Sequence, residues 1–330
     1  MPKPILISGV QPTGKLHIGN YFGALKNFVY LQNSGRYQCY FFIADLHSLT
    51  NDFDASQKYK QISDVVLSFL AAGISPEKST IFIQSQIPEH SELAWILNTI
   101  TPFGELKRMT QFKEKAEHQK ENTNVGLFDY PVLQAADIIL YDAEYVPVGE
   151  DQMQHLELTR SLARKFNAKF KKIFIEPKSL LTETPKIMSL NNPNKKMSKS
   201  MPDGCLFLDD SPETIKNKIK RAVTDSENEV KYRPESKQAI SNLMRIYGGF
   251  SDIPMKEIEK KYKDSKSYSQ FKTDLIQIII DGLKPFQLKK KLLSKKQSYV
   301  EKIIEKGRKK AQLRATNKIK QIKKVLGLAR

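Results

Sequence analysis

An alternation of short apolar runs with amphipathic segments over the first 150 residues is the feature that most constrains the fold of this chain. The first apolar run, Ile5–Val10, has the length of a buried strand, and turn-forming residues follow it at 11–14. A helix is expected to begin near Gly19, because apolar residues then recur at helical spacing. These residues are Tyr21, Leu25, Phe28 and Val29. The pattern therefore predicts a strand, a loop and a helix that packs one face on a sheet.

Three more strands are expected in this part of the chain. They cover residues 39–44, Ser79–Ile83 and Tyr145–Val148, and a helix covers residues 59–72 between the first two of them. Strands that alternate with helices connect into a parallel sheet with helices on both faces. The sequence therefore predicts an α/β fold built on a doubly wound, Rossmann-like sheet.

From residue 212 onward the pattern predicts helices alone. They are expected at 213–223, 241–247 and 268–283, and a long basic helical segment at about 285–326 follows them. This change predicts a C-terminal all-helical domain. We expect two domains, at 1–205 and 206–330, with a helical segment at about 103–140 inserted in the first.

Composition limits the kind of protein. No run of about 18 apolar residues occurs, and the first residues enter a strand without a signal segment, so we expect a cytoplasmic protein without a membrane partner. The two cysteines, Cys39 and Cys205, lie far apart and lack the paired Cys/His spacing of a zinc site. The sequence therefore predicts neither a disulfide scaffold nor a structural metal.

The net charge of +18 is concentrated in the C-terminal part of the chain. Residues 206–330 hold 31 of the 54 Lys and Arg residues but 15 of the 36 Asp and Glu residues. Residues 283–330 have 17 basic residues against Glu301 and Glu305. Such a density attracts a polyanion through phosphate contacts and counterion release, and nucleic acid is the obvious candidate. The alternative is a lysine-rich composition that covers solvated helix faces.

Two short segments carry the strongest chemical signals. Residues 12–20 (PTGKLHIGN) place small residues where a backbone must approach a nucleotide, with His17 and Asn20 at a helix N-terminus that suits phosphate. Residues 196–200 (KMSKS) supply mobile positive charge for a departing pyrophosphate. Taken singly, the first segment also fits an ordinary turn with His17 as a cap or core residue, and the second also arises by chance in a lysine-rich chain. Together they resemble the two nucleotide-binding motifs of class I aminoacyl-tRNA synthetases.

Further stretches resemble the bacterial tryptophanyl-tRNA synthetases, and this resemblance extends over nearly the whole chain. The stretches are residues 9–14 (GVQPTG), 44–47 (ADLH), 104–113 (GELKRMTQFK), 130–137 (YPVLQAAD), 146–152 (VPVGEDQ) and 222–226 (AVTDS). The resemblance implies ATP-dependent activation of L-tryptophan to tryptophanyl adenylate and its transfer to tRNA(Trp), with release of pyrophosphate and AMP. It also implies a catalytic domain at 1–205, a dimer interface within 103–140, an anticodon-binding domain at 206–330 and a homodimer.

The resemblance also implies an amino-acid pocket. Asp137, on an apolar helix, would accept the indole N–H, and Tyr130 and Gln152 would hold the α-amino group. The other lining residues would be Ile7, Gly9 and His47. A site built around a polar partner rejects an analogue that lacks the matching group by roughly 10⁴–10⁵-fold. The alternatives are a structural cap or ion pair for Asp137, strand packing for Ile7 and Gly9, and a satisfied core histidine for His47.

For ATP, which would carry Mg²⁺ with it, the resemblance implies three groups of residues. Those around the phosphates and adenosine would be Gln11, Pro12, Thr13, Gly19 and Asn20. Those near the ribose and adenine would be Gly149, Glu150, Asp151 and Ile187. The second motif would contribute Lys196, Met197, Ser198, Lys199 and Ser200. The catalytic residues would be His17, Lys113, Lys196 and Lys199, although Lys113 stands in a charged stretch that equally suits a solvated loop.

Two positions depart from the family pattern, and three rival functions remain. His17 stands where many bacterial tryptophan enzymes have threonine, and Gln134 stands where methionine is common. Gln134 lies one helical turn before Asp137, so its amide has access to the same pocket.

The rivals are a tyrosyl-tRNA synthetase, a small-molecule adenylyltransferase without a large basic helical domain, and a catalytically silent RNA-binding relative.

Overall fold

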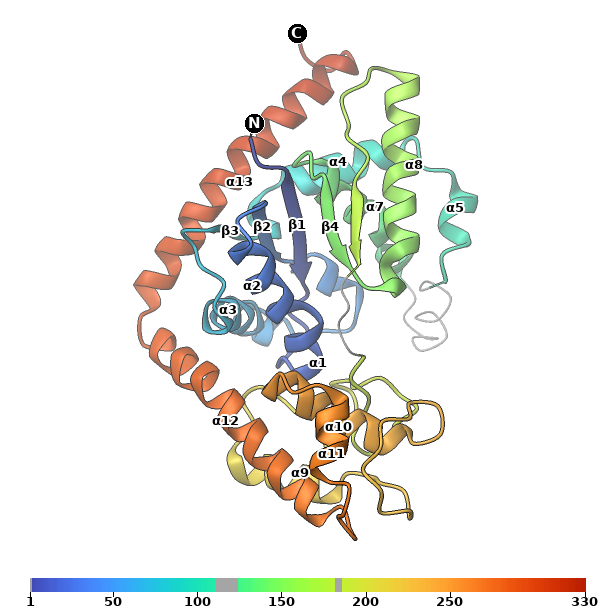
Figure 1. Ribbon diagram of the computed structural model, residues 1–330. Helices are drawn as coiled ribbons and strands as arrows, with labels where there is room; N and C mark the ends of the chain where they lie inside the picture. The colour runs from blue at the N-terminus through green and yellow to red at the C-terminus, as the bar shows by residue number, and fades with distance from the viewer. Residues whose placement is uncertain (1, 111–123, 182–185) are drawn as a thin grey trace.

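A computed structural model describes residues 2–110, 124–181 and 186–330 (Figure 1). Within those residues, five strands form one parallel sheet in the order β3-β2-β1-β4-β5. The strands are β1 (Ile5–Val10), β2 (Gln38–Ile43), β3 (Ser79–Ile83), β4 (Tyr145–Val148) and β5 (Lys178–Leu181). The predicted doubly wound α/β fold is confirmed. The sequence did not indicate β5, because this edge strand is half exposed and its four residues lack a continuous apolar run.

The helices fall into two groups along the chain. Around the sheet lie α1 (Ile18–Asn20), the π-helical turn η1 (Tyr21–Leu25), α2 (Lys26–Asn33), η2 (His47–Thr50), α3 (Ala55–Ala72), η3 (Gln84–Gln86), α4 (Glu89–Asn98), α5 (Phe103–Lys107), α7 (Val125–Ile139), η4 (Glu150–Gln152) and α8 (Met153–Lys169). After them come η5 (Pro202–Gly204), α9 (Pro212–Arg221), α10 (Gln238–Ser251), α11 (Met255–Lys261), α12 (Ser269–Ser294) and α13 (Gln297–Val325). In Figure 1, α9 to α11 lie beyond the ends to which the strand arrows point.

Alternate residues of the central strands point into two separate cores. Leu6 of β1 and Phe41 of β2 belong to the core on the side of α2 and α3, where Phe28 stacks on Phe41 at 4.4 Å between ring centroids. Ile7 and Phe42 belong to the core on the side of α4, α7 and α8. Burying one such side chain contributes about 1.5–3 kcal/mol, so the two layers of helices hold the sheet from both faces.

Helix α12 runs through Pro285 without a break. The expected end of this helix before Pro285 is therefore wrong, and the chain breaks instead between Ser294 and Gln297. A proline inside a helix costs about 3 kcal/mol because it removes a hydrogen bond and crowds the preceding turn. Burial of the neighbouring Leu283 and Phe286 in the core offsets this cost and keeps the helix continuous.

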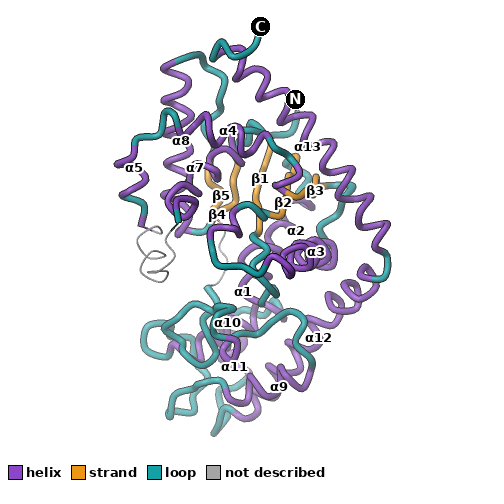
Figure 2. Tube along the Cα trace, turned by 180° about the vertical axis from the view of Figure 1, so that it is seen from behind, coloured by secondary structure: helices purple, strands orange, loops and turns teal. Residues whose placement is uncertain are grey.

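Helix α13 leaves the other C-terminal helices and packs on the edge strand β3 and on α4 (Figure 2). At Gly307 the helix approaches so closely that a Cβ atom there would lie 1.8 Å from the carbonyl oxygen of Ile81. Ala311 and Ala315, at helical spacing from Gly307, are fully buried in the same contact. A covered edge strand cannot pair with another chain. The division at 205/206 stays a prediction, but α13 lies on the sheet of the first segment.

Polar contacts tie the far end of α13 to the sheet-side helices. Arg314 donates from Nε to the carbonyl oxygen of Tyr141 at 2.7 Å, and buried Lys318 donates to the carbonyl oxygen of Ile173 at 2.6 Å. Lys318 also forms an ion pair with Asp142. Part of the basic charge of this segment is therefore used inside the fold. Among the helices of the described ranges, none is both long and apolar enough to span a bilayer.

We expect Gly307→Ala to lower the free energy of unfolding by about 1–3 kcal/mol, because the added methyl group must displace α13 from β3. Urea unfolding followed by circular dichroism measures this change. Gly104→Ala is the matched control, since Gly104 is also helical and has open space around it. Alanine favours a helix over glycine by about 0.5–1 kcal/mol, so equal stabilisation of both variants would contradict the close packing at Gly307.

Candidate active site

A cavity of about 340 Å³ opens at the carboxyl ends of β1 and β4. These two strands are neighbours at the point where the strand order reverses, since β2 and β3 follow on one side of β1 and β4 and β5 lie on the other. Open α/β sheets bind their ligands at this switch point. The cavity is lined by Ile7, Ser8, Gly9, Gln11, Gly23, Ala24, Asn27, Phe28, Phe42, Ala44, His47, Tyr130, Gln134, Asp137, Ile138, Val146, Pro147, Val148, Gly149 and Gln152.

The structure brings all residues that were predicted to line the amino-acid pocket into this one cavity. They are Ile7, Gly9, His47, Tyr130, Asp137 and Gln152. Gln134 lies in the same wall, as its position one turn before Asp137 suggested. Of the residues predicted for ATP, Gln11 and Gly149 also line the cavity. The predicted amino-acid and nucleotide sets therefore meet at its rim.

Asp137 is the buried charged group of the cavity, with 1% of its surface exposed. Its carboxylate contacts His47 Nε2 at 2.6 Å, His90 Nδ1 at 2.6 Å and Gln84 Nε2 at 2.7 Å. Burial raises the pKa of Asp137, but the charge of His47 and hydrogen bonds from His47 and His90 outweigh burial, and the net shift is downward. Asp137 is therefore an ionised acceptor in an otherwise apolar wall.

Two of these partners, Gln84 and His90, were missed in the sequence. Gln84 directly follows β3, and a polar residue at the carboxyl end of a parallel strand is a signal that marks ligand sites. His90 lies in the first turn of α4 and is fully buried, with its Nε2 atom 2.8 Å from the hydroxyl group of Tyr141. No local pattern marks His90, because its partners lie about 50 residues further along the chain.

Close approach of backbone and rings shapes the cavity wall. A Cβ atom at Gly9 would lie 2.7 Å from the ring of Phe42, which stands opposite Gly9 in the β1–β2 register. Across the cavity, the hydroxyl group of Tyr130 lies 2.9 Å from His155 Nε2, and this contact orients the phenol ring. Glycine at position 9 is therefore required for the space, because any side chain there would displace Phe42.

His17 caps the short helix that follows the first motif. Its Nδ1 atom accepts a hydrogen bond from the backbone N–H of Gly19 at 3.1 Å, and Asn20 Oδ1 accepts one from the backbone N–H of His17 at 3.1 Å. The pKa of His17 falls to about 4, first because of burial and then because of Lys199 and Lys196. The ring is therefore neutral at pH 7, and its proton lies on Nε2 as a donor.

The two motifs meet at Lys199, although the residues in contact lie more than 180 positions apart in the sequence. Its ammonium group donates to Thr13 Oγ1 at 3.1 Å and to the carbonyl oxygen of Gly14 at 3.2 Å. Burial lowers the pKa of Lys199 to about 8, although Cys205 and Asp64 act in the opposite direction. The structure thus places a partly desolvated cation directly beside the first motif.

The second motif is held by a short hairpin. Met197 donates to the carbonyl oxygen of Ile187 at 3.0 Å, and both side chains are buried in the core. Asn242 of α10 binds the backbone of Met188 twice, accepting from its N–H at 2.8 Å and donating to its carbonyl at 2.9 Å. The Cβ atom of Ile187 also lies 3.9 Å from the point where a Gly19 side chain would begin. The C-terminal helices therefore position the motif against residues 12–20.

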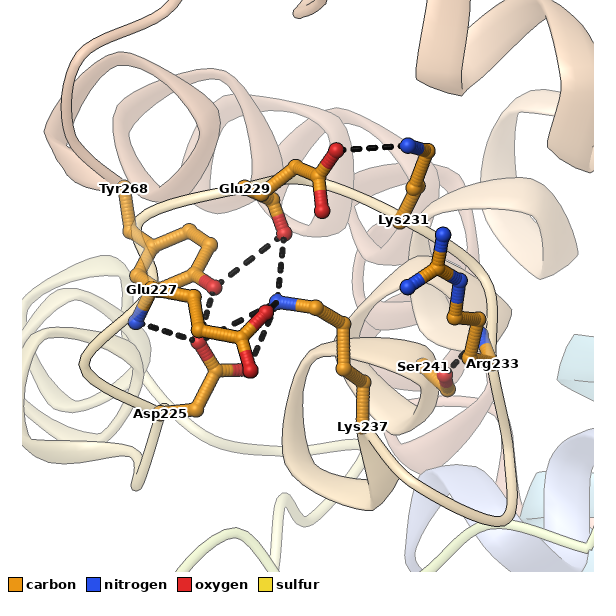
Figure 3. A network of polar contacts seen from close by, with 8 residues as sticks. All are labelled: Asp225, Glu227, Glu229, Lys231, Arg233, Lys237, Ser241 and Tyr268. Atoms are coloured by element: carbon orange, nitrogen blue, oxygen red, sulfur yellow. Dashed lines mark hydrogen bonds and ion pairs between the residues drawn. The ribbon is translucent and has the colours of Figure 1, made fainter.

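A polar network fixes the loop between α9 and α10 (Figure 3). Lys237 has 2% of its side chain exposed and forms ion pairs with Asp225 at 3.4 Å and with Glu227 at 2.8 Å. The hydroxyl group of Tyr268 donates to the same Asp225 carboxylate at 2.5 Å. The loop is joined to the hairpin because the Val223 N–H donates to the carbonyl oxygen of Leu190 at 2.9 Å. Residues 222–226, to which the sequence analysis assigned no role, therefore hold this loop in place through Val223 and Asp225.

The remaining predicted residues lie outside the cavity wall. Pro12 is buried, while Lys196, Ser200 and Asp151 are exposed, and Ser198 contacts Ser200 through its hydroxyl group at 2.9 Å. Asp151 and the backbone of Glu150 lie in η4, next to Gly149. Lys113 lies outside the described residues, so its predicted catalytic role stays a prediction. The nucleotide set is therefore brought together in part, around Thr13, His17, Gly19, Ile187 and Lys199.

A family model and the sequences of known proteins point to the same family. A family model described as "tRNA synthetases class I (W and Y)" matches residues 2–284. The chain is 47% identical to a tryptophan–tRNA ligase of Rickettsia conorii, over 98% of this chain and 99% of that protein.

Solved structures give the same result. The chain superposes on tryptophanyl-tRNA synthetase from Mycoplasma pneumoniae with a TM-score of 0.89 and 34% identity, over 99% of each chain. It also superposes on tryptophanyl-tRNA synthetase from Campylobacter jejuni complexed with ADP and tryptophan, with a TM-score of 0.84 and 36% identity. That match covers 98% of this chain and 99% of the other.

The partly buried position of Lys199 predicts that the stability of the protein depends on pH. The folded pKa of Lys199 is about 8 and its ordinary value is 10.5, so the unfolded chain binds more protons between these values and stability rises with pH. We expect the difference in free energy of unfolding, wild type minus Lys199→Met, to increase from pH 8 to pH 10. Urea unfolding measures this difference. Lys216→Met removes an exposed lysine and is the control. A gap that does not change with pH would contradict burial of the Lys199 ammonium.

Proposed function

The chain belongs to the family of class I tRNA synthetases for tryptophan and tyrosine, and from this premise we propose which residues perform each part of the reaction. The reaction is the ATP-dependent activation of L-tryptophan to tryptophanyl adenylate and its transfer to tRNA(Trp), with release of pyrophosphate and AMP. The enzyme is thus a ligase of protein synthesis. We place it in the cytoplasm, where tRNA is charged for translation, and cell fractionation tests this location.

The observation that carries the assignment of residues is the ionised carboxylate of Asp137 in the wall of the switch-point cavity. An indole ring buries its apolar surface and needs one acceptor for its N–H, and Asp137 is an acceptor-only group at pH 7. Phenylalanine would leave that carboxylate desolvated and without its ligand partner, which is a strong penalty. In this proposal Tyr130 and Gln152 hold the α-amino group, and Ile7, Gly9 and His47 complete the pocket.

Activation requires no side-chain nucleophile. The tryptophan carboxylate attacks the α-phosphate of ATP in line and expels pyrophosphate, so the protein contributes position and charge stabilisation. In this proposal the Nε2–H donor of His17 and the ammonium groups of Lys196 and Lys199 stabilise the phosphate oxygens, and Lys113 contacts pyrophosphate.

The remaining nucleotide contacts complete this part of the proposal. The residues around ATP are Gln11, Pro12, Thr13, Gly19, Asn20, Gly149, Glu150, Asp151, Ile187, Met197, Ser198 and Ser200. We propose that Mg²⁺ enters with ATP, so that excess EDTA stops activation and added Mg²⁺ restores it.

The basic C-terminal part supports a role in tRNA binding. Residues 206–330 carry most of the excess positive charge, and exposed lysines of α13 such as Lys302, Lys309 and Lys320 remain available at the surface. We propose that this segment holds the anticodon end of the tRNA. The KM for tRNA should then rise steeply with salt, because neutralised phosphates release counterions, whereas the KM for tryptophan should not. Equal salt dependence of both constants would contradict this proposal.

Exposed apolar side chains support a homodimer. Trp95 of α4 is 72% exposed, Phe103 of α5 is 70% exposed and Val125 of α7 is 81% exposed. Helix α7 packs on both α4 and α5, and α5 and α7 lie within residues 103–140, the segment that was predicted to form a dimer interface. Most soluble oligomers are twofold dimers. Sedimentation equilibrium should give twice the 37.8 kDa mass of one chain, and a monomer at micromolar concentration would exclude the proposal.

The test of the proposed residues is exchange of pyrophosphate into ATP without tRNA. We expect exchange with tryptophan and none with tyrosine, and we expect Lys199→Ala to lower the rate by about 10²–10³-fold, because one donor to the developing charge is lost. Lys216→Ala, which removes an exposed lysine of α9, is the control. Near-normal exchange in Lys199→Ala would remove Lys199 from the mechanism, and exchange with tyrosine alone would assign the cavity to the sister enzyme.

A further inference from the structure

The two carboxylate oxygens of Asp137 have different surroundings. Oδ1 accepts hydrogen bonds from Gln84 Nε2 at 2.7 Å and from His90 Nδ1 at 2.6 Å, whereas Oδ2 accepts one from His47 Nε2 at 2.6 Å. An ionised carboxylate offers about four acceptor positions, two on each oxygen. Within the described part of the chain, both positions on Oδ1 are therefore filled, and one position on Oδ2 is open.

The open position belongs to the oxygen on the cavity side. His47, the donor to Oδ2, lines the cavity together with Asp137. Gln84 and His90 come from η3 and α4 and reach Oδ1 from behind the described lining. A ligand that enters the cavity therefore meets Oδ2 first.

His90 is fixed in one tautomer by its two contacts. Asp137 as a carboxylate only accepts hydrogen bonds, so His90 Nδ1 must carry the proton of the first contact. Burial raises the pKa of Tyr141 well above its ordinary value, so this phenol keeps its proton and donates to His90 Nε2 at 2.8 Å. The chain Tyr141–His90–Asp137 is therefore directed, and the hydroxyl group of Tyr141 sets the orientation of the imidazole.

We propose that Gln84 and His90 are positioning residues for tryptophan recognition, which occupy Oδ1 of Asp137 and leave Oδ2 as the acceptor for the indole N–H. This inference rests on the proposed role of Asp137 in binding the indole. Neither residue touches the substrate, and both act through the orientation and the ionisation of one carboxylate. The selectivity of the cavity for an N–H group therefore depends on the region between β3 and α4 as well as on the residues that line it.

Loss of these donors has a consequence for pH. Burial raises the pKa of Asp137, and the charge of His47 together with hydrogen bonds from His47 and His90 keeps the net shift downward. When a donor to Oδ1 is removed, less remains to oppose the effect of burial. The pKa of Asp137 therefore rises, and the carboxylate becomes protonated closer to neutral pH. The other titratable or charged groups near this cluster are Tyr40 on β2, Glu89 on α4, Tyr130 on α7, Tyr141 after α7, His155 on α8 and Arg314 on α13.

The first experiment compares Gln84→Met with Gln32→Met. Both substitutions remove a buried glutamine that joins separate elements, but Gln32 binds Gly73 and Ser75, away from the cavity. The readout is the ratio of kcat/KM in pyrophosphate exchange for tryptophan and for β-(benzothiophen-3-yl)alanine, which carries sulfur in place of the indole N–H. Groups whose titration changes kcat/KM equally for both substrates do not affect this ratio. In the wild type we expect a ratio of roughly 10⁴, constant from pH 8 to pH 5.5.

In Gln84→Met we expect the ratio to fall about ten-fold at pH 8, because a hydrogen bond to a charged group is lost, and to fall further as the pH drops to 5.5. Gln32→Met should keep both the ratio and its flat pH profile. A general loss of stability does not change this ratio with pH, so the profile separates positioning from folding.

His90 provides a second pair of variants that does not depend on Gln84. An asparagine amide lies near the place of the histidine Nδ1–H, so His90→Asn keeps a donor to Asp137, whereas His90→Leu removes it. We expect His90→Asn to recover most of the selectivity that His90→Leu loses. Equal losses in both variants would overturn the role of the donor.

The outcomes separate the inference from the assignment of Asp137. If the wild type and Asp137→Asn both accept the sulfur analogue as readily as tryptophan, the proposed role of Asp137 fails. If the wild type discriminates strongly but Gln84→Met and His90→Leu have the flat profile of Gln32→Met, the role of Asp137 stands and the inference about Gln84 and His90 fails.

Discussion

The parallel pairing of β1 with β2 on one side and β4 on the other is the constraint on which the rest of the structure depends. Because the strand order reverses at β1, no connection covers the carboxyl ends of β1 and β4, and a cavity forms there. The same pairing places the turn after β1 and Gly149 after β4 at the rim of this cavity. Residues from both predicted ligand sets therefore converge on one rim.

The site keeps its charges by two different means. Asp137 is fully enclosed, and three hydrogen-bond donors replace the water it has lost. Lys199 is only partly desolvated, and neutral acceptors of the first motif replace part of its hydration. The first arrangement is rigid and suits recognition of one N–H group. The second leaves a cation whose interactions improve when a polyphosphate arrives, which suits stabilisation of a departing pyrophosphate.

Much of the fold and of the cavity was predictable because the signals are local. The four predicted strands and the residues after β1 and β4 follow from apolar runs and turn chemistry, and the resemblance to a known family supplied the roles that we propose for Asp137 and Lys199. Three features were not predictable. β5 is too short and exposed to have a pattern, α12 passes through Pro285 because tertiary packing outweighs local preference, and His90 acquires its meaning from residues that are distant in sequence.

The C-terminal helices contact both the second motif and the strand that leads to the Asp137 cluster. Asn242 of α10 holds the hairpin that carries the second motif, and α13 lies on β3, the strand that leads into Gln84. Both α10 and α13 belong to the basic segment that we propose to bind tRNA. The basic segment therefore contacts both the hairpin that carries Lys199 and the strand that precedes Gln84, and the close approach at Gly307 leaves no room for a side chain between α13 and β3.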